Sequence, residues 1–224
     1  MPTCDPQWQN PAICQRATMN YSAADQPDEA WVFVRSLMDS RRHISPRRLI
    51  EPAPCGPQLN QLLALAACAP DHGRLNPWRF ILVPVEARHQ LAEVFVQALR
   101  DRDPSAGPQQ QEVAREKAHR SPLLLVAVAK LGRTDPDIPA LERMVSMGAA
   151  IQNLLLGATA MGFGSGLTSG QAMSSPHMRR LLNLKEGEQA VCCINIGSIS
   201  QRRTDGGSRP VPEDFFSVLP SSQA

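Results

Sequence analysis

Arginines are concentrated in one ten-residue segment, residues 40–49, which reads SRRHISPRRL. It contains four arginines and one histidine at the end of a predicted helix. Cations at that end stabilise the helix dipole, but four exceed this need. Arginine also forms forked hydrogen bonds with phosphate oxygens and carbonyl groups. The segment therefore predicts either a solvated basic loop or a site for an anionic ligand, and composition alone does not separate the two.

A second polar segment, residues 69–80, reads APDHGRLNPWRF and connects a predicted helix to a predicted strand. Its turn-forming residues are typical of a connector, and Trp78 is expected to anchor the core. His72 has a weak independent claim to a function, because a single loop histidine is usually solvated. On its own the segment predicts structure rather than chemistry.

A glycine-rich segment, residues 162–170, reads GFGSGLTSG. Glycines let a backbone approach a flat or anionic ligand closely. A Rossmann phosphate loop follows a strand and opens a helix, with the spacing G-x-G-x-x-G. Here the glycines follow a long predicted helix and position 167 is leucine, so this motif is rejected. We predict a helix-ending glycine at Gly162 and a flexible loop after it.

Other chemistries find no support in the sequence. It has no nucleophile elbow and no H-E-x-x-H motif, and its six cysteines, at positions 4, 14, 55, 68, 192 and 193, form no C-x-x-C pair. Cys192 and Cys193 lie in an apolar run and are interpreted as buried thiols, which favours a reducing, cytoplasmic location. Without a protein nucleophile or a metal site, redox chemistry would need a bound cofactor.

The composition excludes several classes of partner. The 224 residues carry 23 Lys+Arg and 21 Asp+Glu, and this balance argues against nucleic acid or an anionic membrane as a partner. No apolar run approaches the roughly 20 residues of a membrane-spanning helix. The first residues, MPTCD, do not have the pattern of a signal peptide. A cytoplasmic globular protein is expected.

Hydrophobic periodicity predicts the elements that position these segments. Residues 1–27 are polar and lack periodicity, so they are interpreted as an N-terminal extension. The run PLLLVAVA at 122–129 is apolar at every position, as expected of a strand buried on both faces. Helices are predicted at 28–38, 56–67, 87–99, 112–120, 141–161 and 175–182, and further strands at 79–83 and 190–196. This irregular alternation predicts an α+β fold, a sheet flanked by helices.

In this order and spacing, the segments resemble the nitroreductase family of FMN-dependent oxidoreductases, most closely its minimal, YdjA-like subgroup. The resemblance covers about residues 30–200. Four blocks carry it. The first is the arginine pair at 41–42 with SPR at 45–47 and EPAP at 51–54, and the second is APDH at 69–72 with PWRF at 77–80. The third is GFG at 162–164 with SG at 169–170, and the fourth is a predicted strand that ends in IGS at 196–198. It implies a homodimeric three-layer sandwich with a central mixed or antiparallel sheet. Residues 28–224 would be one FMN-binding domain with a Pro-rich C-terminal tail.

The resemblance also implies a site at the interface of two subunits. Arg41, Arg42 and His43 would reach the FMN phosphate and the ring carbonyls, and Cys68 and His72 would come from the partner chain. Leu167, Thr168 and Ser169 would line the flavin, and the stretch from Gly157 to Gly162 would contact the nicotinamide nucleotide. Arg209 is a further candidate cation for the phosphate. Arg42 or Arg41 is expected to stabilise the reduced flavin, and no catalytic protein acid is expected.

The activity implied is hydride transfer from NADH or NADPH through FMN to a nitroaromatic, a quinone or a similar small-molecule acceptor. The sequence departs from the subgroup pattern at several site positions. His43 replaces a serine, Cys68 an arginine, Gly73 a lysine, and Leu167-Thr168 a Trp-Arg pair. These losses leave alternatives open: a flavin-binding or storage protein, or another superfamily activity such as an oxidase or dehalogenase.

Overall fold

The computed structural model describes residues 28–132, 137–201 and 208–219, so the predicted extension 1–27 lies outside the described residues. The chain divides into two units at Met38/Asp39. The first contains most of α1 (Glu29–Ser40), and the second carries the sheet. Helix α1 was expected, and Asp28 accepts a hydrogen bond from the amide of Ala30 at its start. None of its residues is buried.

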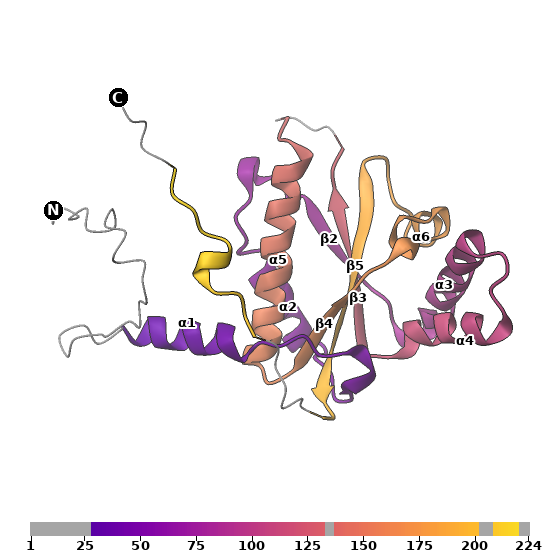
Figure 1. Cartoon of the computed structure of the whole chain (residues 1–224), viewed down its shortest axis with the longest axis horizontal. Helices are drawn as coiled ribbons and strands as arrows, with labels where there is room; N and C mark the ends of the chain where they lie inside the picture. The colour runs from indigo at the N-terminus through magenta and orange to yellow at the C-terminus, as the bar shows by residue number, and fades with distance from the viewer. Residues whose placement is uncertain (1–27, 133–136, 202–207, 220–224) are drawn as a thin grey trace. The chain divides into compact units, whose positions relative to one another are not determined.

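In the described residues, five strands form one sheet: β1 (Leu49–Ile50), β2 (Trp78–Leu82), β3 (Leu123–Lys130), β4 (Gly164–Thr168) and β5 (Glu188–Ile199). The order is β1-β5-β3-β2, with β4 also paired to β5, and these strand pairs are antiparallel (Figure 1). Strand β5 is central because β3 pairs along one edge, while β4 and then β1 pair along the other. A single parallel bridge joins His43 to Ser165 of β4.

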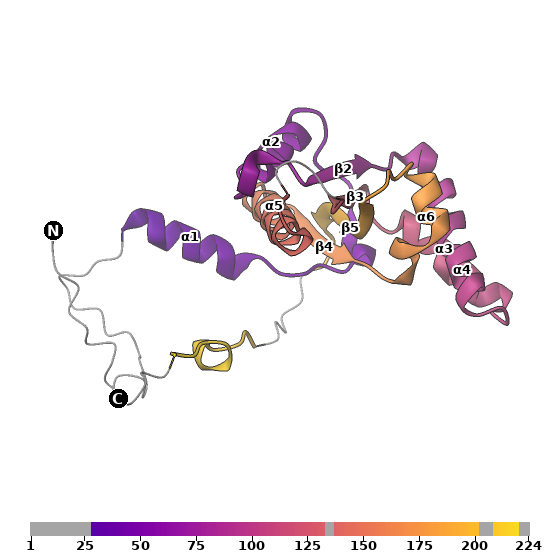
Figure 2. The same ribbon diagram turned by 90° about the horizontal axis from the view of Figure 1, so that it is seen from above.

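Helices cover both faces of the sheet, which makes three layers (Figure 2). Helices α2 (Pro57–Ala66) and α5 (Ala140–Ala160) pack on one face. Helices α3 (Arg88–Arg102), α4 (Pro108–Glu116) and α6 (Pro176–Leu181) lie on the other. Alternate residues of β3 face each layer: Leu123 and Leu125 pack in the first core, Leu124 and Val126 in the second. The predicted α+β sandwich is confirmed.

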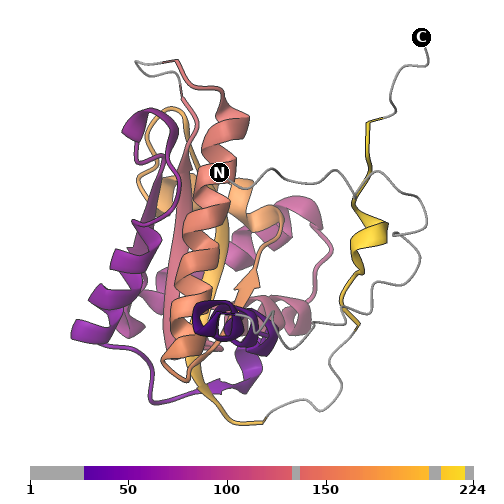
Figure 3. The same cartoon turned by 90° about the vertical axis from the view of Figure 1, so that its left-hand side faces the viewer.

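The long helix α5 lies beside α2 over the sheet (Figure 3). Its Gly157 is buried, and a Cβ there would lie 2.5 Å from Cδ1 of Leu65 and 3.0 Å from Cδ2 of Leu62. Small residues in α5 therefore allow close packing of the two helices, as the sequence indicates. No helix among the described residues is both long and apolar enough to cross a bilayer.

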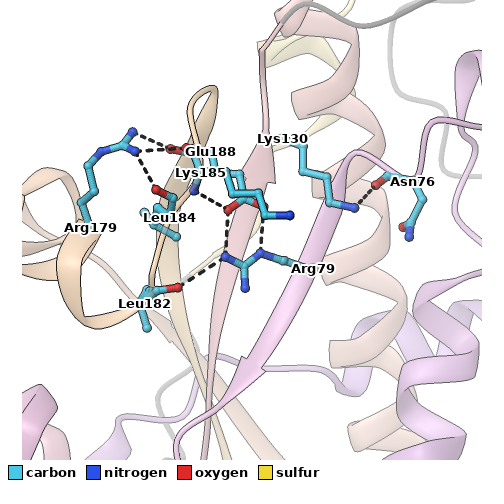
Figure 4. A network of polar contacts seen from close by, with 8 residues as sticks. All are labelled: Asn76, Arg79, Lys130, Arg179, Leu182, Leu184, Lys185 and Glu188. Carbon is cyan, nitrogen blue, oxygen red and sulfur yellow. Dashed lines mark hydrogen bonds and ion pairs between the residues drawn. The ribbon is translucent and has the colours of Figure 1, made fainter.

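A network of ionic groups fixes the end of the sheet opposite the start of β3 (Figure 4). Across β3, the Nε and Nη2 atoms of Arg79 each lie 2.8 Å from a carboxylate oxygen of Glu188. These hydrogen bonds are the main reason that the pKa of Glu188 is lowered. Arg179 donates to the carbonyl oxygens of Leu184, Lys185 and Glu188, which holds the turn between α6 and β5.

The prediction of a flexible loop over residues 162–170 is wrong, because residues 164–168 form β4. The glycines serve close packing between strands: a Cβ on Gly164 would lie 2.6 Å from Cγ1 of Ile199. The predicted cap is confirmed, since Gly162 has φ +86° directly after α5. The gap between the predicted helices 87–99 and 112–120 is also too long, because α3 runs to residue 102 and α4 begins at 108.

Candidate functional site

An open cavity of about 730 Å³ lies in the second unit, beside the end of β4. One wall comes from α3, α4 and the 3-10 turn Lys117–His119. The other comes from the end of β4, the 3-10 turn Gln171–Ser174 and residues 43–46. Apolar side chains contribute to both walls, among them Phe95, Leu99, Val113, Leu124 and Met173. The cavity therefore suits a ligand with an extended apolar part.

Three cations line the cavity, Arg102, Lys117 and Arg120, and the described lining residues include no aspartate or glutamate. Partial burial lowers the pKa of Lys117, and repulsion by Arg120 and Arg102 lowers it further. Burial also lowers the pKa of Arg120, as does repulsion by Arg47, while Glu116 opposes this shift. A bound anion would offset such repulsion. The cavity is therefore suited to a ligand that carries negative charge.

A buried arginine holds the segment that carries two of these cations. Arg88 is 3% exposed, and its guanidinium donates to the carbonyl oxygens of Val83, Ala118, Ser121 and Pro122 at 2.7, 2.7, 3.1 and 3.1 Å. Three of these acceptors lie between residues 118 and 122, around and beyond Lys117 and Arg120. Because a buried charge without hydrogen bonds is costly, this arrangement is strongly favoured over alternatives. Arg88 thus fixes the cationic wall from beneath.

On the opposite side, residues 43–44 pack directly against β4. The amide of Ile44 donates to the carbonyl oxygen of Ser165 at 2.9 Å. A Cβ on Gly166 would overlap the carbonyl oxygen of Ile44 and would lie 3.0 Å from Cε1 of His43. Glycine is therefore required at position 166 by the approach of another segment of the chain. This contact brings His43 to the cavity rim beside the end of β4.

The neutral polar residues of the lining are three with hydroxyl groups, Ser45, Thr168 and Ser169, and three with amide groups, Gln109, Gln110 and Gln171. Asn195 of β5 donates to Oγ1 of Thr168 at 3.1 Å. Cys193, the ladder partner of Thr168, also lines the cavity. Burial raises the pKa of the Cys193 thiol to about 12, so this thiol is a neutral part of the wall.

Comparison with known proteins identifies the fold and the family. The model of the "Nitroreductase family" matches residues 45–198, more than half of the chain. The chain belongs to the nitroreductase family. An Escherichia coli (strain K12) protein named "Putative NAD(P)H nitroreductase YdjA" is 31% identical over 185 residues, which cover 82% of this chain and 97% of the relative. The predicted family, and with it an oxidoreductase enzyme, is confirmed.

Two solved structures share the nitroreductase fold at lower identity. A nitroreductase-like family protein from Bacillus cereus has a TM-score of 0.71 and 20% identity, covering 83% of this chain and 95% of that one. An "FMN and NADPH-dependent nitroreductase" from "sphigopyxis sp. strain HMH" has a TM-score of 0.63 and 15% identity, covering 82% and 97%. At these identities the likeness concerns the fold alone.

Of the predicted site residues of this nitroreductase, His43, Thr168 and Ser169 line the cavity. Leu167 lies in β4 opposite Ile194 and is not among the lining residues. The structure thus brings the arginine-rich segment and the glycine-rich segment together at one cavity. Their roles toward a flavin stay predictions.

Arg41, Arg42 and Arg209 form a second group of cations, outside the cavity lining. Arg209 Nη2 donates to the carbonyl oxygens of Asp39 and Arg41 at 3.3 and 3.2 Å. Arg42 Nη1 donates to the same two carbonyl oxygens. Burial, then repulsion by Arg209 and Arg42, lowers the pKa of Arg41. Arg209 is thus hydrogen-bonded to the backbone at the arginine pair, and this pair directly precedes His43 in the sequence.

The remaining predicted residues lie elsewhere in the chain. Cys68 is exposed at the end of α2, and His72 Nδ1 lies 2.7 Å from a carboxylate oxygen of Glu142. Gly157 is buried against α2, and Gly162 ends α5. Their predicted contacts with a partner's flavin or with the nicotinamide nucleotide stay predictions, and the packing of Gly157 has a structural reason of its own.

Sequence reasoning missed the cations of α3 and of the turn after α4. Residues 112–120 were predicted only as a helix, and Arg102 fell between the predicted helices 87–99 and 112–120. A signal was present: Lys117 and Arg120 are three residues apart, directly before a fully buried strand. Their assembly with Arg102 depends on how α3 and α4 pack, which no local pattern reveals.

Proposed function

We propose that this protein is an FMN-dependent oxidoreductase that takes a hydride from NADH or NADPH and passes two electrons to a nitroaromatic, a quinone or a similar small acceptor. The observation that carries the proposal is the cavity: its described lining combines apolar walls, three cations and no carboxylate, in a chain of the nitroreductase family. The printed names of its relatives, an NAD(P)H nitroreductase and an FMN and NADPH-dependent nitroreductase, favour the same assignment.

The residues present fit FMN. Its ring is flat and largely apolar, and Phe95, Leu99 and Leu124 supply apolar walls. Its phosphate and its reduced ring carry negative charge. The described lining residues include three cations and no carboxylate, and Glu116 outside the lining lies 4.0 Å from Arg120. Its ring edge carries hydrogen-bond acceptors and donors, and the hydroxyls of Thr168 and Ser169 match both. When bound, FMN supplies the hydride acceptor and donor that the side chains lack.

Each group of residues has its own role in this proposal. Lys117 and Arg120 stabilise negative charge on the ligand inside the cavity, where they are partly desolvated and therefore act more strongly. Arg41, Arg42 and Arg209 form the outer cationic group and hold the phosphate. Arg88 keeps the backbone of the cationic wall in place. No described side chain in the lining is needed as a proton donor, because water supplies protons to the product.

A homodimer is part of the proposal. No residue of α1 is buried, and its Trp31, Phe33 and Val34 are 48%, 64% and 40% exposed. In the second unit, Phe215 and Leu219 of the tail are 72% and 90% exposed. Apolar surface of this kind usually marks an interface between proteins. A second copy of the chain would cover these side chains, and dimers are common among nitroreductases.

A cytoplasmic location is also proposed. The four cysteines of the described chain, Cys55, Cys68, Cys192 and Cys193, are free thiols. Free thiols persist in reducing compartments. The proposal follows from these thiols and from the absence of any paired cysteine in the described residues.

The test begins with the purified protein. It should absorb in the visible range as isolated or take up added FMN, with one FMN per chain. Under anaerobic conditions NADH or NADPH should bleach the flavin absorbance, and menadione or nitrofurazone should restore it through many turnovers.

Two outcomes would contradict the proposal. A protein that takes up no FMN is not a flavoenzyme. A protein that holds FMN but shows no turnover with either nucleotide and any of these acceptors is a flavin-binding protein, or carries another activity of the superfamily.

A further inference from the structure

An amide side chain is buried in the sheet directly beneath the cavity. Asn195 is 1% exposed and lies between Ile194 and Ile196 in the apolar strand β5. It faces the same side of the sheet as Cys193, which lines the cavity. A buried amide without partners would cost about 1–3 kcal/mol. The hydrogen bonds of Asn195 therefore explain how a buried amide is tolerated at this position.

The hydrogen bonds of Asn195 connect the two walls of the cavity. Its Oδ1 accepts from the hydroxyl of Ser121 at 2.8 Å, and its Nδ2 donates to the carbonyl oxygen of Gly166 at 3.3 Å and to Oγ1 of Thr168 at 3.1 Å. The carbonyl oxygen of Gly166 can only accept, so the amide nitrogen must face β4. Ser121 belongs to the segment that Arg88 holds. The Gly166 carbonyl oxygen thus fixes the orientation of the amide, which turns Oδ1 toward the hydroxyl of Ser121.

This orientation has a consequence for Thr168. Its hydroxyl oxygen already accepts from Asn195, and the described residues provide no acceptor for the hydroxyl hydrogen. Thr168 lines the cavity, so a ligand in the cavity can accept that hydrogen. Asn195 fills one of the two lone pairs of the Thr168 oxygen and turns the hydroxyl hydrogen away from the amide, so that hydrogen is available to an acceptor on the ligand.

We propose that Asn195 is a positioning residue that holds the Thr168 hydroxyl as a hydrogen-bond donor toward the ligand in the cavity. The inference rests on the proposed function, in which that ligand is FMN. Thr168 would then offer the ligand a directed neutral donor at the end of β4, and this donor requires an acceptor atom on the ligand edge that meets β4.

A double-mutant cycle tests the inference. The holoprotein, Thr168→Val, Asn195→Leu and the double variant are compared by FMN dissociation constant, flavin midpoint potential and visible spectrum. Thr168→Val should weaken FMN binding about five- to tenfold, the range of one neutral hydrogen bond, and should shift the potential. Asn195→Leu should reproduce most of these changes, and the double variant should be no worse than Thr168→Val alone. Thr168→Ser retains the hydroxyl and should restore FMN affinity to within about twofold.

If Asn195→Leu does not fold, Asn195→Ala serves in its place. Alanine has no amide and no charge, so it removes the donor to the Thr168 hydroxyl without placing a new charge beside the ligand. The same potential and spectral change as in Thr168→Val is then expected, with no further change when both are combined.

The outcomes separate the inference from the proposed function. If the effects of the Asn195 and Thr168 substitutions add, Asn195 acts through the fold and the inference is wrong. It is equally wrong if Thr168→Val changes neither FMN affinity nor potential in a protein that binds FMN and oxidises NAD(P)H. If the wild-type protein takes up no FMN, the proposed function fails, and the inference fails with it.

Discussion

Replacing Lys117 with glutamine should weaken FMN binding by about ten- to hundredfold. A charge-assisted hydrogen bond contributes about 1.5–3 kcal/mol, and each 1.4 kcal/mol is about a factor of ten in affinity. Two observations place the effect toward the lower end of this range. Arg102 and Arg120 remain in the lining, and removal of Lys117 relieves the repulsion that lowers its pKa.

The assay is a titration of apoprotein with FMN, followed by quenching of flavin fluorescence. Arg115→Gln is the matched control, because Arg115 lies on α4 but pairs with Glu93 and Glu112 outside the cavity lining. Lys117→Arg adds a pH test. Since the pKa of Lys117 is lowered, wild-type affinity should fall as pH rises through that lowered value. Arginine stays protonated, so Lys117→Arg should not show this fall.

The reasoning would be refuted if Lys117→Gln bound FMN as tightly as the wild type. It would also be refuted if Arg115→Gln weakened binding as much as Lys117→Gln, because the effect would then reflect overall charge and not the cavity.

Three further predictions concern the fold that supports the site. Gly166→Ala should lower the melting temperature strongly because a Cβ there overlaps the Ile44 carbonyl oxygen. Gly107→Ala is the control, since a Cβ there has open space, and it should change the free energy of unfolding by no more than about 1 kcal/mol. Equal effects of the two substitutions would contradict the packing argument. Glu188→Gln should destabilise the protein by about 1–2 kcal/mol in urea unfolding at neutral pH, because it weakens a charge-assisted pair whose remaining Arg79 side chain is 34% exposed. The pKa of Glu188 is lowered in the folded state, so its ionised carboxylate adds to the free energy of unfolding at pH values above its pKa in the unfolded chain. This contribution should be lost as the pH falls through the lowered pKa of the folded state. If the variant and the wild type lose stability equally in acid, Glu188 does not have this role. Brief alkylation of the native protein at mildly alkaline pH should modify the exposed Cys55 and Cys68 and spare Cys192 and Cys193. Burial raises the pKa values of these last two thiols to about 11 and about 12. Mass spectrometry identifies the modified cysteines, and modification of Cys192 and Cys193 before Cys55 and Cys68 would contradict the prediction.

Much of the fold follows from hydrophobic pattern. The run at 122–129 is apolar at every position because β3 is covered on both faces, and this buried strand is correctly predicted. The long apolar helix is correctly predicted for the same reason: α5 packs against both the sheet and α2. Such patterns report burial directly, so sequence alone reveals them.

Strand β4 was missed because its glycines were taken as a sign of flexibility. At Gly164 and Gly166 the absence of a side chain instead allows Ile199 and Ile44 to approach, and this requirement comes from segments far away in the sequence. The polar partners of the site are missed for a similar reason. Oδ1 of Asn195 in β5 lies 2.8 Å from Oγ of Ser121, which precedes β3, and nothing in either local sequence indicates the other.

The candidate site is predicted in part. His43, Thr168 and Ser169 were identified from a resemblance, and the structure places all three on one cavity. Lys117 and Arg120 needed the structure, because their significance depends on the missing carboxylates in the described lining around them. A charged side chain indicates a ligand site only when its neighbouring groups are known, and the fold is needed to identify those neighbours.

The most direct measurement is the structure of the protein with FMN bound. The account predicts an isoalloxazine ring in the cavity between α4 and the end of β4, in contact with Lys117 and Thr168. An FMN molecule bound at another place, with this cavity holding only water, would contradict the account.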